Sequence, residues 1–132
     1  MTLLYLHGGL MVLALAILAG GAAVARFHRR RKWWLKIHRL LGTAGPLAVF
    51  FGLISAYAAI ELIGGLQFAV PHAWFGLLVI AIVLITQSAG LMQFTVPARA
   101  ALLRSLHRWM GRASLVLMTF AMSSGMYLFF YS

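Results

Sequence analysis

Four histidines stand near the starts of four long apolar segments, and three of them have a glycine four residues later. These residues are His7, His38, His72 and His107, with Gly42, Gly76 and Gly111. Residues four apart lie on the same face of a helix, so each glycine leaves a flat clearing beside an imidazole. A planar macrocycle bound to the imidazole would fit such a clearing. The four histidines are therefore candidate axial ligands of haem iron.

The composition indicates that the elements carrying these histidines lie in lipid. Of the 132 residues, 64% are hydrophobic and 9% are charged, whereas soluble domains carry about 25% charged residues. There are 11 lysines and arginines against one acid, Glu61. The sequence has no cysteine, which excludes disulfides, iron–sulfur ligation and thiolate chemistry.

Four apolar runs are each long enough to cross a bilayer, which takes about 20 residues. We predict helices over about residues 3–25, 37–63, 71–94 and 105–131. Pro46 is expected to kink the second helix unless its neighbours satisfy the freed carbonyl, and Pro71 suits the first position of the third. The predicted fold is an all-α membrane protein, an up-down bundle of four transmembrane helices. We expect it to form a single domain over residues 1–132.

All the cations fall within residues 26–39 and 99–112, in and beside two connectors between the predicted helices. Both connectors lie on the same side of such a bundle. By the positive-inside rule this side is cytoplasmic, and both termini are extracytoplasmic. We therefore predict an integral protein of a membrane, in particular a bacterial inner (plasma) membrane. Topology and lipid headgroups explain the charge, so we predict no binding of nucleic acid.

The up-down order sorts the histidines into two levels. His7 and His72 begin helices on the outer side, and His38 and His107 begin helices on the inner side. We predict that each of these pairs ligates one haem b, giving two haems per chain. Residues 14 and 18 positions after each histidine return to about the same face, at the level where the other macrocycle would lie. They are mostly small: Gly21, Ala25, Gly52, Ala56, Thr86, Gly90, Ala121 and Gly125.

Less specific explanations stay open for these residues. A single histidine near a helix end could snorkel or cap, and small residues also arise from close helix packing. Arg39 and Arg108 directly follow the inner histidines and could pair with haem propionates, or could snorkel to the interface. His28 lies outside the pattern, in the basic connector, and is interpreted as solvated.

A series of residues across about positions 5–130 resembles a known family. The series is His7-Gly8 with Leu10-Met11 and Ala25-Arg26, Trp34 through His38-Arg39, His72 with Gly76, Gln87, and Leu106-His107-Arg108 with Gly111. It resembles the cytochrome b561 core, particularly the form fused to extracellular DOMON domains. The resemblance implies a transmembrane electron carrier with two bis-histidine b haems, the first helix pairing with the third and the second with the fourth. Family members usually have six spans or a DOMON partner domain, whereas this chain has four predicted spans.

The expected function is electron transfer between an extracytoplasmic and a cytoplasmic-side redox partner, with no catalytic side chain. The partners could be proteins or small reductants such as quinol or ascorbate. Two other functions stay open. One is an anchor subunit, with or without haem, of a larger quinone-linked respiratory complex. The other is a membrane protein whose histidines bind a metal or relay protons.

Overall fold

The computed structural model describes residues 2–131, and its regular elements are helices. They are α1 (Thr2–Phe27), α2 (Trp34–Leu62), α3 (Pro71–Met92), the short 3-10 helix η1 (Pro97–Arg99) and α4 (Ala100–Tyr131). Each of the four α-helices lies in a segment long and apolar enough to cross a membrane. The predicted all-α fold with four spanning helices is therefore confirmed.

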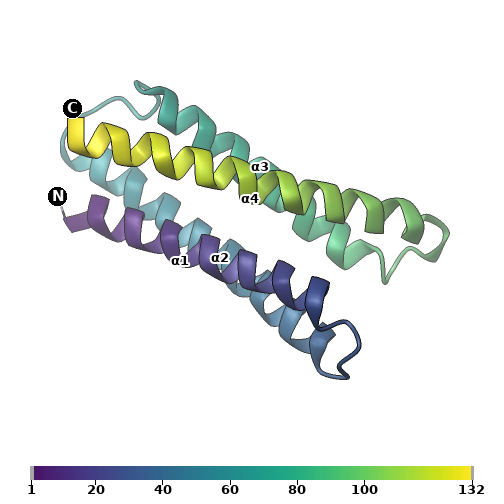
Figure 1. Ribbon diagram of the computed structural model, residues 1–132. Coiled ribbons are helices and arrows are strands. Elements are labelled where there is room, and N and C mark those ends of the chain that lie inside the picture. Colours follow the sequence, from purple (N-terminus) through teal and green to yellow (C-terminus); the bar gives the residue numbers. More distant parts are fainter. Residues whose placement is uncertain (1, 132) are drawn as a thin grey trace.

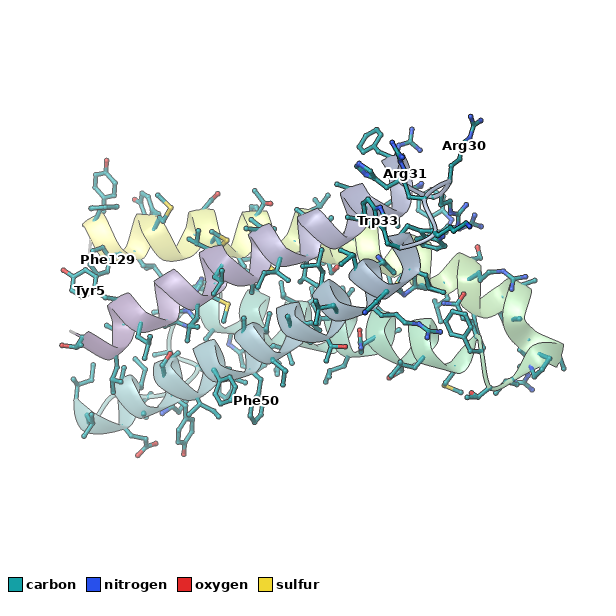
Figure 2. All side chains as sticks on the ribbon, turned by 90° about the horizontal axis from the view of Figure 1, so that it is seen from below. Tyr5, Arg30, Arg31, Trp33, Phe50 and Phe129 are labelled. Atoms are coloured by element: carbon teal, nitrogen blue, oxygen red, sulfur yellow. The ribbon has the colours of Figure 1, made fainter. Side chains whose placement is uncertain are left out.

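The helices run alternately up and down, so that both chain ends lie at one end of the molecule (Figure 1). The turn between α2 and α3 lies at this end, which we call the terminal end. The connectors after α1 and after α3 lie at the opposite end, the connector end. Arg30, Arg31 and Trp33 mark the connector end in Figure 2, and Tyr5 packs beside Phe129 at the terminal end.

The bundle consists of two helical hairpins. α1 packs along α2, and α3 packs along α4, much more extensively than either hairpin packs on the other. Contacts between the hairpins are made by α1 with α4 and by α2 with α3. Within residues 2–131, no Cα atoms of α1 and α3, or of α2 and α4, approach within 8 Å. The predicted ligand pairs therefore come from helices on the diagonals of the bundle.

The apolar core lies where the two hairpins meet, midway along the helices. It is formed mainly by small side chains: Ala14, Ala48, Val49, Val79, Val83, Met118 and Ala121. The outward faces carry large apolar side chains, such as Phe50 and Val116, which are 55% and 69% exposed. Such a surface suits lipid, which is as apolar as these side chains. α2 continues through Pro46 without interruption.

Candidate metal centres

The four helix-borne histidines form two pairs, one near each end of the bundle. At the terminal end, His7 of α1 faces His72 of α3, with ring centres 6.1 Å apart and ring planes at 80°. At the connector end, His38 of α2 faces His107 of α4, with ring centres 5.8 Å apart and planes at 89°. The structure thus brings together the same two pairs that the up-down order predicted. We call them the outer pair and the inner pair.

The spacing in each pair suits one metal ion between two imidazoles. Two metal–nitrogen bonds of about 2 Å, with each ring centre roughly 1 Å beyond its nitrogen, separate the ring centres by about 6 Å. In the described part of the chain no three His, Cys, Asp or Glu side chains gather as they would around a bare ion. A haem supplies the equatorial ligands itself and needs only two axial imidazoles. The pairs therefore fit haem better than a free metal ion.

In every one of these rings, Nδ1 lies within hydrogen-bond distance of a backbone carbonyl on the neighbouring helix of the same hairpin. The contacts are His7 to Gly52 at 2.8 Å, His38 to Gly21 at 2.9 Å, His72 to Ala121 at 3.0 Å and His107 to Thr86 at 2.9 Å. A carbonyl oxygen can only accept, so Nδ1 carries the proton and donates it. Nε2 keeps its lone pair and is the nitrogen that can coordinate. Metal-ligating histidines commonly have such a partner, which fixes their tautomer and ring orientation.

The four accepting carbonyls occupy equivalent positions in the sequence. Each belongs to the residue 14 positions after the histidine of its own helix: Gly21, Gly52, Thr86 and Ala121. At 1.5 Å per residue, 14 residues cover about 21 Å, which separates the two levels of histidines along the helices. The two helices of each hairpin therefore position each other's histidine, and the two hairpins do so in the same way.

The glycines 18 positions after two of the histidines make room for an imidazole. A Cβ atom added at Gly90 would lie 2.8 Å from His107 Nδ1, and one added at Gly125 would lie 2.7 Å from His72 Cε1. Cβ atoms essentially never approach other atoms so closely. The structure places the neighbouring helix's histidine ring against these two glycines, because the hairpin register brings the glycine and the ring to one level. That a macrocycle also lies at this level stays a prediction.

The glycines four residues after the histidines border much looser space. An added Cβ at Gly76 would meet no described atom within 4 Å. At Gly42 the nearest atom would be Gln87 Oε1 at 3.8 Å, and at Gly111 it would be Thr86 Cγ2 at 3.6 Å. All three positions could accept a Cβ without a clash, so the backbone beside these histidines is not crowded. That the three glycines border a macrocycle stays a prediction.

The two arginines that follow the inner histidines are exposed at the connector end. The Arg39 guanidinium lies over the ring of Phe94, 4.3 Å from its centre, in a cation–π contact between α2 and the segment after α3. Arg108 lies on α4. Their pairing with propionates stays a prediction. His28 is exposed in the connector and packs against Trp33, with ring centres 5.4 Å apart.

Trp34, one of the residues that carry the family resemblance, packs on His38 with ring centres 6.1 Å apart. Two serines near the pairs were not found by sequence reasoning. Ser124 Oγ lies 3.1 Å from His72 Nδ1, and Ser55 bonds the carbonyl that accepts from His7. The two serines share one signal, because each stands 17 positions after the histidine of its own helix.

Comparison with known proteins gives the family. A family model described as eukaryotic cytochrome b561 matches residues 6–104. A cytochrome b561, DM13 and DOMON domain-containing protein of Arabidopsis thaliana is 31% identical over 130 residues, which cover 91% of this chain and 14% of that protein. No solved structure gives a significant match. Both matches are eukaryotic and lend no support to the bacterial membrane expected from the sequence. The chain belongs to the cytochrome b561 family, whose members are integral membrane proteins that bind haem b and carry electrons across the bilayer.

Proposed function

We propose that this chain transfers single electrons across a membrane with two haem b groups, one held by His7 and His72 and the other by His38 and His107. The observation that carries the proposal is the pair of diagonal imidazole couples, spaced at 6.1 and 5.8 Å, with every Nδ1 bound to a carbonyl. When bound, haem supplies an iron that exchanges one electron between its ferrous and ferric states.

The side chains and backbone of the hairpins orient the histidines and exclude water. The Nδ1–carbonyl bonds hold the ring planes in place and keep Nε2 unprotonated for coordination. The two levels, about 21 Å apart along the helices, place one pair near each face of the membrane. Between the levels, the small apolar residues of the core exclude water. The four histidines would hold the two haems, and the chain's own residues would bind and orient these groups without making or breaking a bond in a substrate.

The positive connectors support an orientation. All 11 cations flank them, so we propose that the connector end faces the cytoplasm and that both termini face outward. His7 and His72 then lie toward the extracytoplasmic side and His38 and His107 toward the cytoplasm. We further propose that residues 1–132 act as one four-helix domain.

The basic connector end also favours an anionic reductant. We propose ascorbate as the first small donor to test, and quinol or a redox protein as the others. The chain spans 14% of its plant relative. The DM13 and DOMON domains in that protein's name support a second candidate function, in which this four-helix domain is a haem-bearing anchor for a redox partner.

A haem assay on the purified protein tests the proposal. A pyridine haemochrome measurement should give two b haems per chain with low-spin spectra. His107→Ala should remove the inner haem and leave the outer one, because only one couple loses a ligand. His28→Ala is the matched control, since His28 is exposed in the connector, and should retain both. A chain that binds no haem, or a His107→Ala variant that retains two, would contradict the proposal.

A further inference from the structure

We infer that Ser55 and Ser124 raise the reduction potential of the haem held by His7 and His72. They would do so by donating a hydrogen bond to the carbonyls that accept from these two histidines. The inference rests on the proposed function. It makes the two serines positioning residues, because they act on the metal through the ligands' hydrogen bonds and not by contact with it.

The shared acceptor is seen most clearly at Gly52. The carbonyl oxygen of Gly52 accepts from His7 Nδ1 at 2.8 Å and from Ser55 Oγ at 2.8 Å. Ser55 is only 5% exposed, so water does not compete for its hydroxyl.

The same arrangement recurs in α4. The carbonyl oxygen of Ala121 accepts from His72 Nδ1 at 3.0 Å and from Ser124 Oγ at 2.7 Å. Ser124 Oγ also lies 3.1 Å from His72 Nδ1. Both histidines of the outer pair therefore donate to a carbonyl that a serine hydroxyl also uses.

The inner pair lacks this arrangement. His38 donates to Gly21 and His107 donates to Thr86. The residues three positions after these acceptors, equivalent to Ser55 and Ser124, are Val24 and Ala89, which have no hydroxyl. The Thr86 hydroxyl bonds to the carbonyl of Ile82 and so does not add a donor to its own carbonyl.

The number of hydrogen-bond donors to each carbonyl should affect the reduction potential of the haem iron. A carbonyl oxygen has two lone pairs, and inside a helix it already accepts from the N–H four residues later. The histidine is its second donor, and the serine is a third. The hydroxyl proton draws on the same negative charge, so the histidine N–H is polarised less and the imidazole becomes a weaker base. A less basic ligand stabilises ferric iron less, which raises the potential.

The hydrogen-bond distances indicate that the two pairs differ in the basicity of their imidazoles and not in their geometry. All four Nδ1–oxygen distances lie between 2.8 and 3.0 Å, so the pairs differ in donors and not in geometry. Ser124 can also accept part of the His72 N–H bond, which opposes its effect as a donor. Among the described residues Ser55 Oγ only donates, to the Gly52 carbonyl, so we expect it to have the larger effect. A higher potential at the outer pair would favour electron flow from the connector end to the terminal end.

The test is a spectroelectrochemical titration of the haem-loaded protein that resolves two midpoint potentials. Ser55→Ala with Ser124→Ala should shift one midpoint downward and leave the other in place. Repeated in a His107→Ala background, which retains the outer haem, the shift should persist. In a His72→Ala background it should vanish. The matched control is Ser123→Ala, since Ser123 is exposed and donates to the Thr119 carbonyl, which accepts from no histidine in the described chain.

A second series keeps the inference testable if the alanine variants lose haem. Ser55→Cys and Ser124→Cys keep nearly the same volume and replace the hydroxyl by a weaker donor, so they should give a smaller downward shift. Ser55→Thr retains a hydroxyl, so the midpoint potential of the outer haem should stay closer to that of the unmodified protein than it does in Ser55→Ala. The inference is overturned if the outer midpoint stays in place, rises, or moves no more than with Ser123→Ala. It is equally overturned if the inner midpoint moves as far. A chain without haem would instead contradict the proposed function.

Discussion

The terminal and connector ends of the bundle present histidine couples of nearly the same geometry in different surroundings. Ring centres are 6.1 Å apart at the terminal end and 5.8 Å at the connector end, and every ring donates to a carbonyl 14 residues after a histidine. Yet the connector end carries all the cations, in the connectors and in the adjoining ends of the helices, whereas the terminal end carries the single acid, Glu61. Within residues 2–131, serine hydroxyls share the carbonyls that accept from the outer pair and not those that accept from the inner pair.

This comparison separates two physical tasks. The position of each ring follows from the register of an antiparallel hairpin, which repeats in both halves of the chain. The electrostatic surroundings follow from side chains that differ between the ends, namely the cations at the connector end and Glu61 and the two serines toward the terminal end. Variants that disturb the register should therefore remove a haem. Variants that change the surroundings should shift a potential and leave haem content intact.

The largest expected effect is at the glycines that touch the imidazoles. Gly125→Val should displace His72 and remove the outer haem, whereas Gly90→Val should displace His107 and remove the inner one. Haem content and the two midpoints of the purified variants would show which haem is lost. Gly9→Val is the control, because an added Cβ there meets no described atom within 4 Å. Loss of both haems, or of the wrong one, would show that the two levels are not independent.

A smaller effect is expected from the cations beside the inner pair. Arg39→Gln and Arg108→Gln should lower the midpoint of the inner haem, because a nearby positive charge favours the reduced form. The Coulomb energy of such exposed charges is about 1 kcal/mol or less and is screened by salt. Titration at low and high ionic strength should show the shift fading as salt increases. A shift that is independent of salt, or that appears at the outer haem, would contradict this assignment.

The smallest effect on the haems themselves is expected from the contact that joins α1 to α4 at the terminal end, because this contact acts on helix packing and only indirectly on a haem. Tyr5 and Phe129 meet edge to face with ring centres 5.2 Å apart, and such pairs contribute about 0.5–1.5 kcal/mol. Tyr5→Ala should therefore lower the temperature at which the outer haem is released and affect the inner haem less. Thermal melts followed in the haem absorbance would measure this. Val116→Ala, at a lipid-facing position 69% exposed, should leave both transitions unchanged.

Much of the architecture follows from the sequence alone. The length of the four apolar runs requires four spans, and the placement of the cations puts both connectors on one side. An alternating chain then has only one way to sort His7, His38, His72 and His107 into two levels. The family resemblance, carried by these histidines and their neighbours, was confirmed by comparison. The haem ligands themselves stay a prediction, which the geometry supports.

The tertiary structure alone decided how each helix is rotated about its axis. α1 and α3 are apolar on nearly all sides, so their sequence periodicity does not say which face meets a neighbour. The packing of two hairpins settles this, and with it which carbonyl each Nδ1 meets. It also placed the imidazoles of His107 and His72 against Gly90 and Gly125, and it brought Ser55 and Ser124 to the carbonyls that accept from the outer pair. The spacing of the histidines along the sequence determines how deep each one lies in the membrane, whereas contact between helices determines the direction in which each side chain points.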